Sequence, residues 1–520
     1  MVETNATEVR FEPSGKTANV PPGTTLTDAA AAAGVTLQAP CGGAGLCRGC
    51  RVFAQGELSP LDPAERSLLT AEEIATGARL ACRARVSGPV TVWRRRPTAA
   101  SAAAIGRPGV EPLDWAGLSP ALAFDVGTTS LVAGLVDLRS GDIVRTLAAA
   151  NPQREWGADV MSRISSAQAG ALEDMRRAVT EALAGMARDL LESARACTGE
   201  DAAEGSWAQG PVDAALVGNP AMLHILAAVD PGPLGTAPYE AAFLDEREIE
   251  ESELSLPSGS RATTLPAIGP HVGADAVADA LAARLVGKEE PVLLVDLGTN
   301  AEALLWDGSG TLWATSAAAG PAFEGGGLSS GMPATEGAIE GVTQGSSGFD
   351  LSVIGGGRPR GFCGSGILEL MALMLEEGTM EESGRLLSAP ELPDGLMLTQ
   401  QDVRSVQLAK GAVTAALDVL LEKADIGAED LTRVFVAGAF GRRLSAQTLV
   451  RLGIIHPEWG ARVRFLGDAA LSGAARWLAD PGAREEATRI RERARLVDLA
   501  RDESFQKRFM GALDFVWPGR

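Results

Sequence analysis

Four cysteines near the start of the chain have a spacing that suits metal ligation. Five residues separate Cys41 from Cys47, two separate Cys47 from Cys50, and 31 separate Cys50 from Cys82. Thiolates are soft ligands that bind iron–sulfur clusters and zinc. Structural zinc sites usually pair two short C-x₂₋₄-C knuckles, whereas here three ligands crowd one loop and the fourth is distant. The spacing therefore favours an iron–sulfur cluster over zinc.

The loop that carries the first three cysteines is rich in glycine, at positions 42, 43, 45 and 49. Cluster sulfides and thiolates carry negative charge that backbone N–H groups must solvate, and glycine lets the chain wrap closely around them. The spacing resembles that of plant-type ferredoxins, with one extra residue in the first gap. This longer gap resembles the adrenodoxin-like branch. The resemblance implies a 2Fe–2S cluster held by the four cysteines.

Two later loops combine aspartate, glycine and hydroxyl residues directly after an apolar strand. They lie about 170 residues apart and are Asp125-Val-Gly127-Thr128-Thr129 and Asp296-Leu-Gly298-Thr299-Asn300. Glycine lets backbone N–H groups approach a phosphate, threonine donates hydrogen bonds, and aspartate can hold Mg²⁺ or its waters. A single loop of this kind is usually an ordinary hairpin. Its recurrence indicates a duplicated unit.

A third element, the apolar strand and glycine-rich turn from Val434 to Gly441, completes a resemblance to actin-like (ASKHA) ATPases. In that superfamily, two Asp-Gly-Thr hairpins from ribonuclease H-like halves hold the phosphates of ATP, and a late glycine turn packs against adenosine. The resemblance implies phosphate or Mg²⁺ contact for both loops and nucleotide contact for Gly438 and Gly441. It implies catalytic roles for Asp296, which would orient the attacking water, and for Asp125. Glu302 is a weaker candidate, on the strand after the second loop.

The elements that must position these residues predict an α/β multidomain chain. Strands at the start, a helix from Thr25 to Ala33 and the cysteine loop follow the order of a β-grasp ferredoxin. The expected domains are a 2Fe–2S ferredoxin-like domain (1–95), a linker rich in alanine, glycine and proline (96–117), a first actin-like lobe (118–287), and a second lobe with a C-terminal helical tail (288–520).

Composition narrows the partners and the compartment. The formal net charge of −21 argues against binding to nucleic acid. No run of 18 residues is apolar throughout, and the start of the chain lacks the pattern of a signal peptide, so we expect a cytoplasmic protein without a membrane partner.

Several other residues are expected to be structural. Cys197 and Cys363 are predicted to be inert thiols, and Ser365 to cap the helix that follows Cys363. The chain has only three histidines, so a histidine-rich metal site is excluded. The glycine-rich stretch 320–331 is too irregular for a dinucleotide-binding fingerprint.

The whole chain resembles the reductive activators of corrinoid proteins, which join a ferredoxin domain to an actin-like ATPase. Further matching motifs are Asn151-Pro-Gln, Gly157 to Arg163, Val217-Gly-Asn-Pro220 with Met222 and His224, Gly273-Ala-Asp275 and Gly467-Asp-Ala-Ala470. The resemblance implies a 2Fe–2S cluster, ATP and Mg²⁺ as cofactors. Its partners would be a corrinoid protein of a methyltransferase system, which receives one electron at Co(II), and an upstream electron donor.

Other functions stay open at this point. A small-molecule kinase would share the ATPase fold, and a redox scaffold would use the nucleotide only to set its conformation. The ATP-driven activators of hydroxyacyl-CoA dehydratases hold their cluster between subunits, which a four-cysteine domain does not require. The number of subunits is not determined, and a homodimer is one expectation.

Overall fold

A computed structural model describes most of the chain. The described residues are 6–12, 16–35, 37, 50–69, 73–74, 77–93, 119–196, 210–345, 348–438 and 444–518. The predictions for Cys41, Cys47, Cys197, Gly441 and the linker 96–117 lie outside these residues.

The N-terminal part forms a five-stranded sheet of order β2-β1-β5-β3-β4. Its strands are β1 (Thr7–Glu12), β2 (Lys16–Val20), β3 (Arg51–Leu58), β4 (Ala78–Leu80) and β5 (Val86–Trp93). β1 and β5 are parallel, and the other pairs are antiparallel. Helix α1 (Leu26–Ala32) begins after Thr25, whose hydroxyl caps the Asp28 N–H, and buries its apolar face in the same core. The predicted order of strand, hairpin and helix is confirmed.

Two six-stranded sheets make up the body, and each contains the same arrangement of strands. The first has the order β10-β11-β9-β6-β7-β8 and the second β19-β18-β12-β13-β14-β20. In both, three antiparallel strands (β6 to β8, β12 to β14) are followed by two parallel neighbours (β9 and β11, β18 and β19). The predicted duplication is therefore confirmed at the level of topology.

The strands of the first sheet are β6 (Pro120–Val126), β7 (Ser130–Asp137), β8 (Asp142–Ala150), β9 (Ala214–Gly218), β10 (Arg247–Ile249) and β11 (Ala262–Thr264). Those of the second are β12 (Val292–Leu297), β13 (Ala301–Trp306), β14 (Leu312–Ala317), β18 (Arg433–Ala437), β19 (Val463–Gly467) and β20 (Ala494–Leu496). A smaller sheet of order β16-β15-β17 contains β15 (Ala338–Gly345), β16 (Gly348–Val353) and β17 (Gly361–Phe362).

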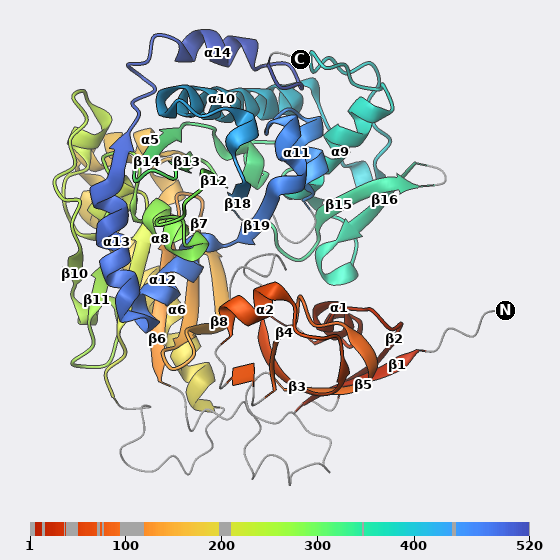
Figure 1. The fold of residues 1–520 in the computed structure, drawn as a ribbon. Coiled ribbons are helices and arrows are strands. Elements are labelled where there is room, and N and C mark those ends of the chain that lie inside the picture. The colour runs from red at the N-terminus through yellow and green to blue at the C-terminus, as the bar shows by residue number, and fades with distance from the viewer. Residues whose placement is uncertain are drawn as a thin grey trace.

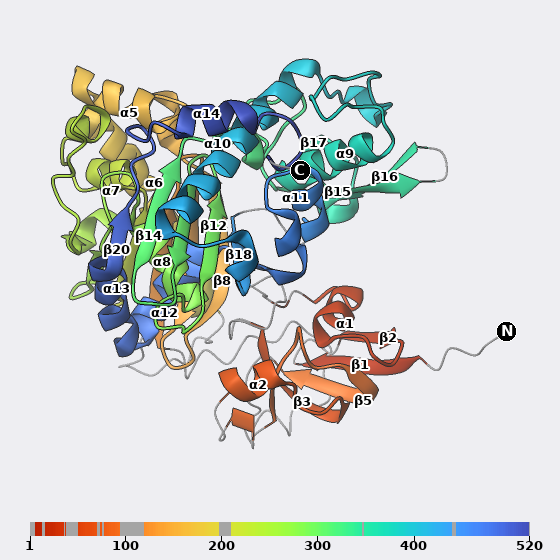
Figure 2. The same cartoon turned by 45° about the horizontal axis from the view of Figure 1, so that its top comes forward.

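Helices α8 (Ala274–Ala283) and α12 (Ala469–Ala479) pack against each other, as Figures 1 and 2 show. α12 and α13 (Pro481–Arg493) come from the end of the chain, yet their buried residues share a core with the first sheet. β20 then returns to the edge of the second sheet beside β14. The segment from α12 to β20 therefore packs against both lobes.

The N-terminal domain also contains α2 (Pro63–Leu68). The other helices of the body are α5 (Val160–Ser166), α6 (Leu172–Ala196), α7 (Pro220–Leu226), α9 (Gly364–Glu376), α10 (Gln400–Ala424), α11 (Ala446–Arg451) and α14 (Phe505–Gly511). α10 contains the fully buried Lys410, whose Nζ donates to the carbonyl oxygens of Ala512, Asp514 and Val516 and so fixes the segment after α14. None of the helices among the described residues is long and apolar enough to cross a membrane.

The N-terminal domain lies next to β8 in Figures 1 and 2. A charged contact joins the two: Nη2 of Arg51 donates to Oδ2 of Asp142 at 2.8 Å, and Nη1 donates to Glu73 at 2.5 Å. Only 10 % of the Arg51 side chain is exposed. The residue directly after Cys50 therefore binds the first residue of β8, just after the turn between β7 and β8.

The contact between α8 and α12 depends on a glycine. A Cβ added at Gly473 would lie 1.8 Å from the carbonyl oxygen of Ala278, a distance that no side chain tolerates. We expect Gly473→Ala to destabilise the protein by about 1–3 kcal/mol, because the helices must move apart. Chemical denaturation of the full chain measures this. Gly185→Ala in α6 is the matched control, since nothing lies near its added Cβ, and it should stabilise by up to about 1 kcal/mol. Equal effects of the two substitutions would contradict the prediction.

Candidate functional site

Two of the four predicted cluster ligands lie in the described part of the chain, and they converge. Cys50 precedes β3 and Cys82 follows β4, and their Sγ atoms are 3.2 Å apart. The two are not joined by a disulfide, and Cys50 is buried. Cys41 and Cys47 lie outside the described residues. The pair fits two ligands of one cluster, brought together from positions 32 residues apart in the chain.

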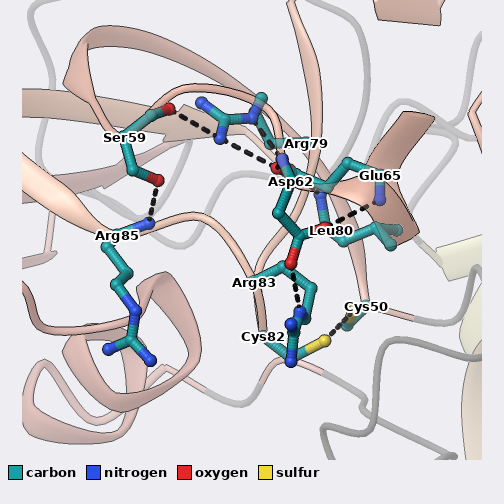
Figure 3. Close-up of polar contacts among 9 residues, drawn as sticks. All are labelled: Cys50, Ser59, Asp62, Glu65, Arg79, Leu80, Cys82, Arg83 and Arg85. Atoms are coloured by element: carbon teal, nitrogen blue, oxygen red, sulfur yellow. Dashed lines mark hydrogen bonds and ion pairs between the residues drawn. The ribbon is translucent and has the colours of Figure 1, made fainter.

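A network of charged side chains holds the segment that carries Cys82 (Figure 3). The buried Glu65 accepts hydrogen bonds from Arg79 Nε at 2.8 Å and from the Leu80 N–H at 3.0 Å. Asp62 accepts from Arg83 Nε at 2.5 Å. This hydrogen bond raises the pKa of Arg83, and the nearby Cys82 thiolate adds to the rise. A cation held beside a thiol favours the thiolate, which is the form that binds metal.

The two predicted phosphate loops meet in the body. They are the turns between β6 and β7 and between β12 and β13, and the hydroxyl oxygens of Thr129 and Thr299 lie 2.9 Å apart. Thr128 and Thr299 are buried, while Asp125 and Asp296, near the ends of β6 and β12, are partly buried. The structure therefore brings together loops that are 170 residues apart.

Three side chains donate hydrogen bonds to the first loop: two of them bind its carbonyl groups, and the third binds the Thr128 hydroxyl. Asn151 donates from Nδ2 to the Gly127 carbonyl at 2.8 Å, and its own N–H donates to the Thr129 carbonyl at 3.0 Å. Arg163 donates from Nη2 to the Thr128 carbonyl at 2.5 Å, and Asn219 donates to the Thr128 hydroxyl at 2.9 Å.

Arg163 is fully buried, and this burial lowers the pKa of its guanidinium to about 10. Asn151, Arg163 and Asn219 belong to motifs that matched the family without an assigned role. Their hydrogen bonds show that all three side chains hold the first loop in place.

The second loop is held differently. The Thr299 carbonyl accepts from the Gly320 N–H at 2.8 Å, and the Thr299 N–H donates to Oε1 of Glu324 at 2.9 Å. Asn300 completes this turn and is partly buried. Gly438 lies at the end of β18, beside β12, with φ of +122°, and its N–H donates to the Gly467 carbonyl.

Glu302 pairs with Asp296 across β12 and β13, and it is buried. Its Oε1 accepts a hydrogen bond from the Ser316 hydroxyl at 3.0 Å. Loss of solvation raises the pKa of Glu302 well above its usual value, and the charges of Asp275 and Asp296 raise it further.

Additional carboxyl groups join those of the two loops. Asp275 and Asp279 lie one turn apart on α8, and Asp468 caps α12 through the Leu471 N–H. Loss of solvation raises the pKa of Asp296 to about 7, with a contribution from Asp275, and that of Asp275 to about 6. Desolvation also raises the pKa of Asp125 well above its usual range, and the charge of Asp468 is the largest of the further contributions.

Both carboxyl oxygens of Asp279 are buried and receive no hydrogen bond from a donor group in the described part of the chain. Its carboxyl neighbours that of Asp296. Carboxylates of this kind suit Mg²⁺, which usually keeps several waters and takes one or two protein ligands. No group of three or more histidine, cysteine, aspartate or glutamate side chains within the described ranges is arranged to hold a metal ion directly.

Sequence reasoning did not assign roles to Asp275, Asp279, Glu324 and Asp468. Asp275 and Asp468 occur in matching motifs, and the spacing of Asp275 and Asp279 in an alanine-rich helix was the available signal. Two acids on one apolar helical face are unusual unless they line a site.

Two residues outside the site were also predicted. Cys363 is buried, as expected, and it occupies the N-cap of α9. The prediction that Ser365 caps this helix is wrong, since Ser365 lies in the first turn and its hydroxyl donates to the Glu340 carbonyl.

The raised pKa values predict a pH dependence of stability. The pKa of Asp296 is about 7 in the folded protein and near its ordinary value of 3.8 when unfolded. The folded state binds more protons between these values, so stability falls as pH rises through this window. We expect the melting temperature to fall between about pH 4 and about pH 7 in the absence of Mg²⁺, and to fall less in Asp296→Asn. Asp425→Asn, at an exposed position with φ of +54° that suits asparagine, should leave the slope unchanged. An identical slope in Asp296→Asn and the parent would contradict the prediction.

Family models match three segments of the chain. Residues 9–87 match the 2Fe-2S iron-sulfur cluster binding domain, residues 120–288 the RACo middle region, and residues 290–518 the C-terminal ASKHA domain of RACo. Together these segments include both phosphate loops, Cys50 and Cys82. The 2Fe–2S domain and the ASKHA domain that the sequence predicted are therefore present.

Similar proteins of known role come from two organisms. The corrinoid activation enzyme RamQ of Eubacterium limosum is 32% identical over 425 residues, which are 75% of this chain and 69% of that protein. The [Co(II) methylated amine-specific corrinoid protein] reductase of Methanosarcina barkeri is 29% identical over 303 residues, 53% of this chain and 54% of that protein. A solved structure, the reductive activator for corrinoid,iron-sulfur protein, has the same fold, with a TM-score of 0.69 and 24% identity over 98% of both chains. The chain therefore belongs to the family of reductive activators of corrinoid proteins.

Proposed function

We propose that the protein uses ATP to drive the transfer of one electron from a 2Fe–2S cluster to the Co(II) ion of a corrinoid protein, which restores Co(I). The observation that carries this proposal is the meeting of two Asp-Gly-Thr loops, with the Thr129 and Thr299 hydroxyls 2.9 Å apart. Membership of the family supports the corrinoid protein as the electron acceptor.

The electron transfer is uphill, which explains the need for ATP. Plant-type clusters have potentials near about −400 mV. For a one-electron step, each ~59 mV of unfavourable potential corresponds to about 1.4 kcal/mol. One electron would pass from the bound cluster to each cobalt ion, a separate electron donor would replace it, and ATP would supply the driving force through a change of conformation.

The residues predicted from the sequence would have distinct roles in this reaction. Cys41, Cys47, Cys50 and Cys82 would hold the cluster, which supplies the single electron when it is bound. Backbone N–H groups and hydroxyls of the two loops would contact the phosphates, and Gly438 and Gly441 would lie against the nucleoside.

The carboxylates of Asp125 and Asp296 would contact Mg²⁺ through waters, since several acids lie near one another but no three form a direct ligand set among the described residues. Asp296 is also the proposed partner of the attacking water, because a pKa of about 7 lets it accept a proton near neutral pH. Glu302 would support the charge balance from the neighbouring strand.

The physiological setting is part of the proposal. The acceptor would be the corrinoid protein of a methyltransferase system in the cytoplasm, and a separate electron donor would reduce the cluster. The formal net charge of −21 argues against nucleic acid as a partner.

The cluster assignment predicts a metal content. Anaerobically purified protein should contain about two irons per chain and show a paramagnetic signal after reduction. Cys82→Ala should lose both, because it removes one of two converging thiols. Cys363→Ser should keep them, since its thiol is buried beside α9, in the second lobe. Iron loss in Cys363→Ser, or stoichiometric zinc in the parent, would contradict the assignment.

The two functions should be separable. Asp296→Ala should keep the reducible cluster but lose ATP-stimulated reduction of a Co(II) corrinoid protein, because it removes a carboxylate that positions Mg²⁺ or water. The measurement is the spectral decay of cob(II)alamin in the partner protein, with and without ATP. Asp425→Asn is the control and should behave as the parent. Equal ATP stimulation in Asp296→Ala and the parent would remove Asp296 from the mechanism.

A further inference from the structure

Glu324 occupies an unexpected place in the second phosphate loop. It ends the short 3₁₀ helix Pro321–Glu324, and its Oε1 accepts the Thr299 N–H at 2.9 Å. The same oxygen packs against Gly298, where an added Cβ would lie 3.2 Å from it. A carboxylate oxygen therefore lies against the turn and accepts a hydrogen bond from a backbone N–H of the loop.

This position puts a negative charge among other negative charges. The charge of Glu324 contributes to the raised pKa of both Asp125 and Asp296, so its carboxylate lies near the two loop aspartates. The hydrogen bond to Thr299 compensates for part of that repulsion, because a charged acceptor makes a stronger bond than a neutral one. A phosphate oxygen has the same charge and the same preference for N–H donors, and it cannot use the Thr299 N–H while Glu324 does.

The segment that carries Glu324 has a glycine at each end. Gly320 has φ of +79° and Gly325 has φ of +81°, in a region that only glycine adopts readily. Gly320 also donates its N–H to the Thr299 carbonyl. The backbone that carries Glu324 is thus fastened to the loop at Gly320, and the glycines allow the intervening residues to change conformation.

We propose that Glu324 is a built-in competitor of the nucleotide phosphates, which holds the Thr299 N–H until a phosphate displaces it. This inference rests on the proposed ATP binding and adds a residue that tunes it. Phosphate binding would release the carboxylate and shift the segment 321–324, so that occupancy of the second loop is linked to a movement of the protein. Glu324 would change nucleotide binding only through its hydrogen bond with the Thr299 N–H and would not contact the reacting atoms.

The test compares nucleotide affinity in the full chain by isothermal titration calorimetry. Glu324→Gln keeps the size and an acceptor oxygen but removes the charge. It should bind ATP with Mg²⁺ roughly tenfold more tightly than the parent, because a neutral acceptor competes less well for the N–H than a charged one. Glu324→Ala, which removes the acceptor, should also bind ATP more tightly. Adenosine has no phosphate and should bind all variants equally.

Glu377→Gln is the matched control, since Glu377 is exposed just after α9 in the same lobe. It should bind ATP as the parent does. Melting temperatures identify any variant that fails to fold. Unchanged or weaker ATP binding in folded Glu324→Gln and Glu324→Ala would overturn the role of Glu324, since a residue that only shapes the loop would weaken binding when changed. A parent that binds adenosine but gains nothing from the phosphates of ATP would instead overturn the proposed function together with this inference.

Discussion

Carboxyl groups lie close together where the two lobes meet, and the packing of the body has to overcome their mutual repulsion. Asp125 and Asp296 come from the two loops, Asp275 and Asp279 from α8, and Asp468 from the start of α12. Each raises the pKa of at least one other or is raised by it. Buried carboxylates are stable together only if protons or a cation compensate their charge. α8 and α12 bring these groups together through a helix contact that is close enough to require Gly473. The close packing of the two helices therefore concentrates negative charge. This charge lowers the stability of the folded protein, and a bound cation would offset that loss.

The two halves share a topology but hold their loops in different ways. In the first loop, Asn151 and Arg163 bind the carbonyl groups of Gly127 and Thr128, and Asn219 binds the Thr128 hydroxyl. The side chains that hold this loop are therefore hydrogen-bond donors. In the second loop, a carboxylate takes the Thr299 N–H. The duplication therefore preserved the strands, while the groups that control each loop diverged.

The sequence was sufficient to predict the fold and the loops, because these depend on local patterns. Continuous apolar strands, Asp-Gly-Thr turns and the cysteine spacing are each visible within short segments. The acids of α8, Glu324 and Asp468 were not predicted as part of the site, since their position depends on how distant elements pack. Asp279 illustrates this, because in the sequence it is one acid in an alanine-rich helix, and only the contact of α8 with the second sheet brings it beside Asp296. The prediction for Ser365 was wrong for a local reason: the helix begins two residues earlier than a cap at that position requires, and Cys363 takes the N-cap instead.

The strand β8 connects the contact with the N-terminal domain to the first phosphate loop. It begins at Asp142, which binds Arg51 directly after Cys50, and it is followed by Asn151, which holds the carbonyls of Gly127 and Thr129. Nine residues of extended strand span about 30 Å. Screening at physiological salt weakens charge interactions between exposed groups beyond about 8 Å. If a nucleotide binds at this loop as proposed, its phosphates lie several screening lengths from the Arg51 contact, and their field acts on that contact only weakly. An effect of the nucleotide on the N-terminal domain would then depend on a movement of the protein, and β8 is a strand that ends at both places.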